Sequence, residues 1–145
     1  MSAETCGFAP APVIHIAAAL IDDGLGRILL VRKAGTGCFM QAGGKMEEGE
    51  LPHDALCREI REELGIAIEP ADAEYLGCFH AVAANEPDHL VKAEIFHLRV
   101  TAEFRPGAEI EEARWIGLGE APALTLAPLT RDHVLPLAAS LMMPL

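Results

Sequence analysis

The sequence lacks any apolar run long enough to cross a bilayer. The nearest approach, residues 13–21, is interrupted by His15 and is about half as long as a transmembrane helix. The N-terminal segment carries Glu4 and no cluster of Lys or Arg, so a secretory signal is not expected. We therefore expect a soluble protein of the cytoplasm.

Cysteine is scarce and scattered. The four residues, Cys6, Cys38, Cys57 and Cys78, form no C-x-x-C pair. Their spacing therefore supports neither a zinc site nor a redox-active dithiol. We expect reduced thiols that are buried or incidental.

Positive charge is also scarce, because 11 basic residues face 22 acidic ones and the formal net charge is −11. Proteins that bind nucleic-acid polymers need a cationic surface, so a partner of that class is excluded. An acidic surface also repels a polyphosphate unless metal ions supply positive charge locally. The positions of the acidic residues therefore matter most for function.

The chain of 145 residues has room for one folded domain. Its composition, 51% apolar and 23% charged, is typical of a globular protein. Residues 1–12 contain two prolines and are expected to form a flexible N-terminal lead-in. Residues 13–145 are expected to form a single domain without internal repeats.

Apolar patterning predicts an α/β domain with a mixed sheet. Strands are expected at residues 13–21, 27–33, 75–83, 90–102 and 113–117, with a further short segment at 38–41. The first strand is apolar at consecutive positions, so both of its faces should be covered.

Two helices are expected, each with a distinctive start. The first should run from about Pro52 to Leu64 after a glycine-rich turn at 43–49, and Gly65 suits its left-handed closing residue. Its start is weak, because the preceding residue is a leucine without a capping oxygen. The last helix should run from Thr130, as cap, to about residue 142, with a kink or delayed start at Pro136.

Three glutamates share one stripe of the first helix. At 100° per residue, Glu63 lies about 40° to one side of Glu59 and Glu62 about 60° to the other. Like charges at this spacing repel by roughly a few tenths of a kcal/mol per exposed pair, so the arrangement has no structural benefit. Carboxylate oxygens are the ligands that Mg²⁺ prefers. The stripe indicates a metal site, with a solvated helix face as the alternative.

A longer motif surrounds this stripe. Residues 44–66, GKMEEGELPHDALCREIREELGI, satisfy G-x5-E-x7-R-E-U-x-E-E-x-G-U at every position, where U is aliphatic. This pattern is the Nudix box, and the chain resembles Nudix hydrolases. The resemblance implies an α/β/α sandwich with a mixed sheet between helices, and a hydrolase that cleaves a diphosphate linkage in a nucleoside diphosphate derivative.

The resemblance also implies roles for individual box residues. The glutamates of the stripe are expected to hold divalent metal ions, Mg²⁺ or alternatively Mn²⁺, with the backbone carbonyl of Gly43 as a further ligand. Glu50 is expected to pair with Arg58 and to fix the loop against the helix, so that Arg58 organises the site. One glutamate of the cluster, or a later one, is expected to act as general base.

Residues outside the box are expected to complete the site. Many family members use one more carboxylate from a later loop, for which Glu109 is the first choice and Glu112 the second; ordinary loop acids are the alternative. Candidates for contacts with substrate phosphates, against the alternative of surface residues, are Arg32, Lys33, Gln41 and Lys45.

The motif leaves the substrate open. Relatives that cleave 8-oxo-dGTP use an asparagine near the start of the last helix, and residues 128–132 contain none; Asn85, the only asparagine, lies elsewhere. We expect a small-molecule nucleotide as partner, first a (d)NTP, with ADP-ribose or another nucleoside-diphosphate sugar as alternative. A non-hydrolysing ligand sensor is a further alternative. An isomerase on the same scaffold needs a cysteine in the pocket, which neither Cys57 nor Cys78 is placed to supply. Either a monomer or a homodimer is compatible.

Overall fold

The structure is a computed structural model and describes residues 11–142. The expected lead-in, residues 1–12, lies outside the described residues except for its last two positions. No helix in the described part of the chain is both long enough and apolar enough to cross a membrane.

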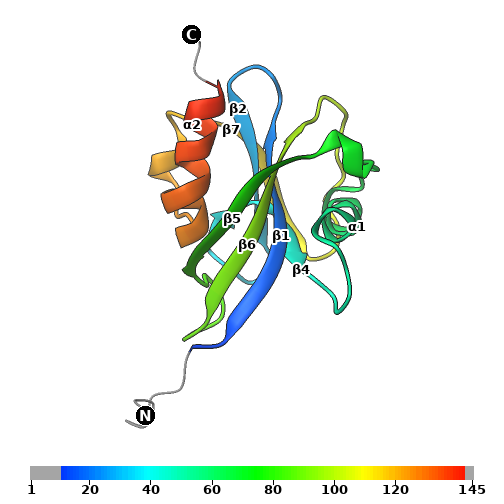
Figure 1. The fold of residues 1–145 in the computed structure, drawn as a ribbon. Coiled ribbons are helices and arrows are strands. Elements are labelled where there is room, and N and C mark those ends of the chain that lie inside the picture. The colour runs from blue at the N-terminus through cyan, green and yellow to red at the C-terminus, as the bar shows by residue number, and fades with distance from the viewer. Residues whose placement is uncertain (1–10, 143–145) are drawn as a thin grey trace, which may run out of the picture.

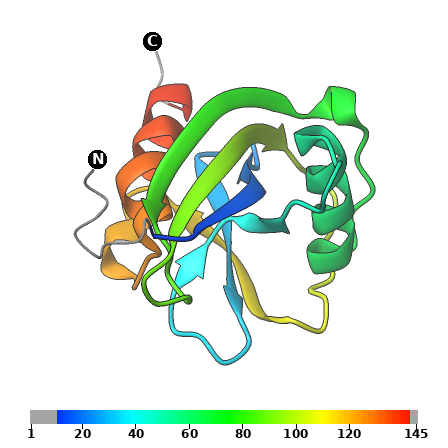
Figure 2. The same cartoon turned by 60° about the horizontal axis from the view of Figure 1, so that its bottom comes forward.

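One mixed sheet lies between two helices (Figures 1 and 2). Its strands are β1 (Val13–Asp22), β2 (Arg27–Lys33), β3 (Phe39–Met40), β4 (Ala42–Lys45), β5 (Glu74–Val82), β6 (Leu90–Arg99) and β7 (Ile110–Gly117). Helix α1 (Pro52–Leu64) covers one face and α2 (Leu135–Met142) covers the other. Short 3-10 turns lie at Pro70–Asp72 and Ala121–Ala123. The expected α/β/α sandwich is confirmed.

Strand β1 is central to the sheet. It runs parallel to β6 along its whole length, from the pair Val13 and Leu90 to the pair Asp22 and Arg99, and antiparallel to β4. Its alternate residues enter two separate cores: Ala17 and its same-face neighbours pack under α1, whereas Leu20 packs under α2. The prediction that both faces are covered is confirmed.

The prediction of a turn at residues 43–49 is wrong for its first part, because Ala42–Lys45 is strand β4. Gly43 pairs with Ala18 of β1, and a Cβ on Gly43 would lie 2.3 Å from the carbonyl oxygen of Ala17. The backbones of β4 and β1 therefore lie too close together for any side chain at position 43. The glycines in the sequence suggested a turn and did not indicate this close strand pairing. The turn itself follows β4 and leads into α1.

Helix α1 has the predicted bounds. No side chain caps its start at Leu51, as expected, and Pro52 occupies the first helical position. Gly65 closes the helix with φ 68°, and its N–H donates to the carbonyl of Arg61 over 2.9 Å. These signals are local, so the sequence alone is sufficient to predict them.

The last helical region differs from the prediction. Thr130 does not cap it but begins a π-helical turn, Thr130–Val134, that precedes α2. Residues 128–129 are already helical, so Thr130 lies inside the helical region and not at its start, and its hydroxyl donates to the side-chain oxygen of Gln41 over 3.1 Å. Pro136 lies in the first turn of α2, directly after the wider π turn; the start is not delayed, because the helical region already begins at residue 128, and the departure from α-helical geometry ahead of Pro136 is the π turn.

Strand β7 begins earlier than residue 113, at Ile110, because residues 110–117 pair with β2. Glu112, expected as the second choice in the loop before this strand, therefore belongs to the strand itself. Glu109 remains in the preceding loop.

Candidate active site

The two glycines of β4 lie against the carboxylates of α1. A Cβ on Gly44 would be 2.5 Å from the carboxylate of Glu59, so the missing side chain makes room for it. The N–H of Gly43 donates to Oε1 of Glu63 over 3.0 Å. The glycine pair thus holds one carboxylate by a hydrogen bond and accommodates another by close contact.

Glu63 is the buried member of the stripe, with 6% of its surface exposed. Burial, with the added charges of Glu59 and Glu109, raises its pKa from 4.5 to about 7, against the opposing effects of the Gly43 N–H and Lys33. The Lys33 amine lies 3.8 Å from the Glu63 carboxylate. The carboxylates therefore stand close enough to disfavour one another's charge, as in sites that bind cations.

Backbone hydrogen bonds bring the loop before β7 to the end of α1. The N–H of Gly107 donates to the carbonyl of Glu63 over 2.8 Å, and a Cβ on Gly107 would lie 2.2 Å from the carbonyl oxygen of Glu62. At the other end of this loop, the carbonyl of Glu109 accepts from the N–H of Ala34 over 2.9 Å. Glu109 consequently lines the same cavity as the three helix glutamates.

Arg58 connects the loop to the stripe. Its guanidinium donates twice to Glu50 over 2.9 Å, once to Glu59 over 2.7 Å and once to the carbonyl of Lys45 over 3.1 Å. The hydrogen bonds from Arg58 and from the N–H of Glu47 lower the pKa of Glu50 to about 2. This two-bond geometry fixes the planar guanidinium and, through it, one carboxylate of the stripe.

The donor set fits a hard divalent cation. Four glutamates, Glu59, Glu62, Glu63 and Glu109, line one cavity, and carboxylate oxygens are the ligands that Mg²⁺ and Mn²⁺ prefer. Across residues 11–142, no three His, Cys, Asp or Glu side chains are drawn together closely enough to hold one ion. Arg58 forms an ion pair with Glu59, and the Lys33 amine lies near the carboxylate of Glu63. The side chain of Glu62 is 60% exposed.

The structure separates the predicted phosphate-binding residues. Lys33 and Lys45 line the carboxylate cavity, and the Lys45 amine also lies 3.5 Å from Glu86. Arg32 lines none of the cavities at the site and instead donates to Glu112 over 3.3 Å. Glu112, the second choice for the later carboxylate, is the partner in this ion pair and lines none of these cavities.

A second, mainly apolar pocket of about 130 Å³ adjoins the carboxylate cavity. Asn85, in the loop between β5 and β6, lines both spaces, although its sequence position suggested that it lay elsewhere. It was missed because this loop comes close to β4 only through the pairing of both β6 and β4 with β1. Gln41 lines the apolar pocket, together with Lys33 and Lys45, and does not line the carboxylate cavity.

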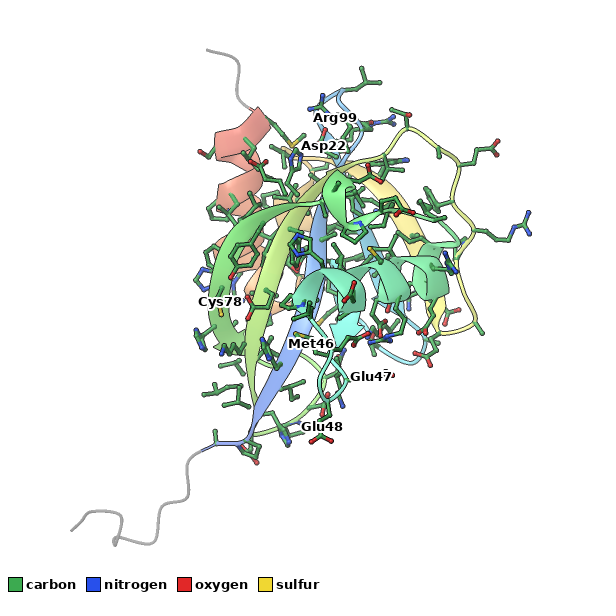
Figure 3. The ribbon with its side chains drawn as sticks, turned by 45° about the vertical axis from the view of Figure 1, so that its right-hand side comes forward. Asp22, Met46, Glu47, Glu48, Cys78 and Arg99 are labelled. Atoms are coloured by element: carbon green, nitrogen blue, oxygen red, sulfur yellow. The ribbon has the colours of Figure 1, made fainter. Side chains whose placement is uncertain are left out.

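Neither Cys57 nor Cys78 lines these cavities. Figure 3 shows Cys78 on β5, apart from the loop that carries Glu47 and Glu48. Burial and nearby carboxylates raise the pKa of the Cys57 thiol, which disfavours a reactive thiolate. These two thiols therefore give an isomerase no support.

Comparison with known proteins identifies the family. The model of the NUDIX domain matches residues 12–138, so the chain belongs to the Nudix family. It is 35% identical over 122 residues to an octanoyltransferase from Myxococcus xanthus, covering 78% of this chain. It is 34% identical over 125 residues to a CTP pyrophosphohydrolase from Escherichia coli, covering 80% of this chain and 84% of that protein.

The fold also matches solved structures. A MutT protein from Methanosarcina mazei superposes with a TM-score of 0.77 at 22% identity, covering 94% of this chain and 100% of that one. Some curated relatives are longer: the chain spans 33% of the Myxococcus protein and 65% of another relative.

Proposed function

We propose that this protein is a metal-dependent hydrolase that cleaves a diphosphate linkage in nucleoside triphosphates. The observation that carries the proposal is that Glu59, Glu62, Glu63 and Glu109 line one cavity beside the glycine pair, next to an apolar pocket. The similarity to a relative named as a CTP pyrophosphohydrolase, which the chain covers over most of its length, supports this substrate class.

The carboxylates are the proposed ligands of Mg²⁺ or Mn²⁺, together with the carbonyl of Gly43. Divalent ions bound there would neutralise phosphate charge and lower the pKa of a coordinated water. Arg58 positions Glu59 for this purpose, and the N–H of Gly43 positions Glu63. A carboxylate of the group, Glu63 or Glu109, accepts the proton of the attacking water.

Two lysines complete the proposed phosphate site. Lys33 and Lys45 line both the carboxylate cavity and the apolar pocket, so their amines stand where a triphosphate would pass from one to the other. Their positive charge offsets the acidic surface locally. The nucleoside end of the substrate then occupies the apolar pocket.

We also propose a cytoplasmic location.

Turnover of a substrate panel tests the proposal. Release of phosphate or diphosphate is measured with nucleoside triphosphates, ADP-ribose and nucleotide sugars in Mg²⁺ or Mn²⁺. Glu63→Gln should lower kcat by about 100-fold or more while the protein still folds, a loss typical of removing one charge-stabilising group. Glu48→Gln, on the exposed loop before α1, is the matched control and should retain activity (Figure 3).

The possible outcomes are distinct. An unaltered kcat in Glu63→Gln would overturn the assignment of the site. Turnover of ADP-ribose without turnover of triphosphates would favour the alternative substrate. Inactivity of the unmodified protein on the whole panel would favour a ligand sensor.

A further inference from the structure

Gln41 is a buried amide that is only half satisfied by the protein. Its exposed fraction is 5%. Its Oε1 accepts a hydrogen bond from the hydroxyl of Thr130 over 3.1 Å. Its Nε2 has no partner among residues 11–142. Buried polar groups are nearly always paired, and an unpaired donor costs free energy, so a partner from outside the protein is the simplest explanation.

The surroundings of Gln41 indicate what kind of partner this is. Its side chain lines the apolar pocket, together with Ile16 of β1 and with Ala127 and Leu129 ahead of the π-helical turn. Apolar walls with a few convergent polar groups, here including Gln41 and Asn85, are typical of sites that bind small ligands such as a nucleobase. The pocket also adjoins the cavity of carboxylates and lysines, where the phosphates are expected.

We propose that this pocket holds the base of the nucleotide and that Gln41 selects for bases bearing a keto oxygen. The Nε2 group of Gln41 donates to that oxygen, and the hydroxyl of Thr130 keeps the amide in the required orientation. This inference rests on the proposed function and names the substrate class within it. It also gives Gln41 a role different from the phosphate contact expected from the sequence.

The selectivity follows from the occupied carbonyl end of the amide. A glutamine with both ends free pairs with adenine, because it accepts from the N6 amino group and donates to a ring nitrogen. In Gln41, the oxygen already accepts from Thr130, so an amino group of the base would have to share it, whereas the Nε2 donor is entirely free. Guanine offers two neighbouring acceptors, O6 and N7, and uracil offers O4, whereas adenine offers N7 beside an amino donor that faces the Nε2 donor unfavourably. Guanine and uracil nucleotides should therefore be preferred over adenine nucleotides.

Two pocket variants and one control test this proposal. In the unmodified protein, kcat/KM for GTP and UTP should exceed that for ATP by about 10- to 100-fold, the range expected for a base-specific hydrogen-bonding contact. Gln41→Leu should lose most of this preference by lowering the GTP and UTP values. Thr130→Val should raise the ATP value relative to GTP, because the amide is then free to turn. Thr125→Val, an exposed position outside the pocket, should change nothing.

Binding measurements separate this inference from the proposed function. Calorimetry with GMP, UMP and AMP reports the base preference without hydrolysis. If no triphosphate is hydrolysed, the proposed function fails, yet tighter binding of GMP and UMP that is lost in Gln41→Leu still supports the base-reading role. An unchanged preference in Gln41→Leu, equal binding of the three monophosphates, or binding of none would overturn it. Thr130→Val is nearly isosteric, so it provides a second readout if the leucine variant folds poorly.

Discussion

The buried carboxyl of Glu63 should make the metal-free protein less stable as the pH rises. The unfolded chain releases this proton near the ordinary pKa of 4.5, whereas the folded protein keeps it until about pH 7. Burial is the main cause, and the charges of Glu59 and Glu109 add to it. Because the folded pKa is raised, its contribution to stability is complete below about pH 4.5 and is lost as the pH rises through about 7.

The size of this loss of stability follows from the difference between the pKa values of Glu63 in the unfolded and the folded protein. The pKa of Glu63 rises from 4.5 to about 7, and each pKa unit corresponds to 1.36 kcal/mol. The protonated carboxyl therefore contributes about 3 kcal/mol to the free energy of unfolding. One kcal/mol moves the Tm of a domain of this size by about 2–4 °C, so the expected change is roughly 6–12 °C. Other groups titrate in the same window, so the quantity to compare is the difference between two variants.

Thermal or urea unfolding with a chelator, followed from pH 4.5 to 8, provides the measurement. The unmodified protein should lose about 3 kcal/mol relative to Glu63→Gln across this window, because glutamine has no proton to release. Glu48→Gln should follow the unmodified protein. If the stabilities of Glu63→Gln and the unmodified protein stay parallel over the whole window, the reasoning is refuted. Adding Mg²⁺ at pH 8 should restore stability to the unmodified protein and not to Glu63→Gln.

Two further predictions concern residues that position the carboxylates. Gly107→Ala should lower both Tm and kcat, the latter by about tenfold or more, because its Cβ would lie 2.2 Å from the carbonyl oxygen of Glu62 and the loop must move. Gly37→Ala, which meets nothing within 4 Å, is the control, and equal activity of the two variants would contradict the prediction. Arg58→Lys should weaken Mn²⁺ binding by about 10- to 100-fold in calorimetry, because lysine cannot make the two-bond contact with Glu50. An unchanged affinity would show that this contact does not position the ligands.

Local signals made α1 predictable before the structure was known. The first and closing residues of the helix, Pro52 and Gly65, act through backbone geometry within a few positions. The period of the helix then places Glu59, Glu62 and Glu63 on one stripe whatever surrounds them. The same reasoning failed for β4, because an extended glycine pair is stable only when another strand pairs with it.

Contacts between distant segments explain the remaining differences. The sequence predicted that Thr130 caps the last helix, but its hydroxyl donates to the side chain of Gln41, which is 89 positions away. The sequence placed Asn85 in a loop away from the expected site, yet it lines both cavities. The choice between Glu109 and Glu112 depended on a strand register that pairs Glu112 with Arg32. Each outcome depends on how distant segments pair or pack, which short sequence patterns do not encode.

The sequence by itself determined the family, the bounds of α1 and the three carboxylates on one helix face, because helical spacing and the motif are properties of one continuous segment. Only the tertiary structure decided which other groups meet that face. The loop before β7 brings Glu109, strand β4 brings the glycine pair, and the π-helical turn orients Gln41. These groups converge because antiparallel pairing and helix packing join segments far apart in the chain, where the free energy of contact depends on the whole fold.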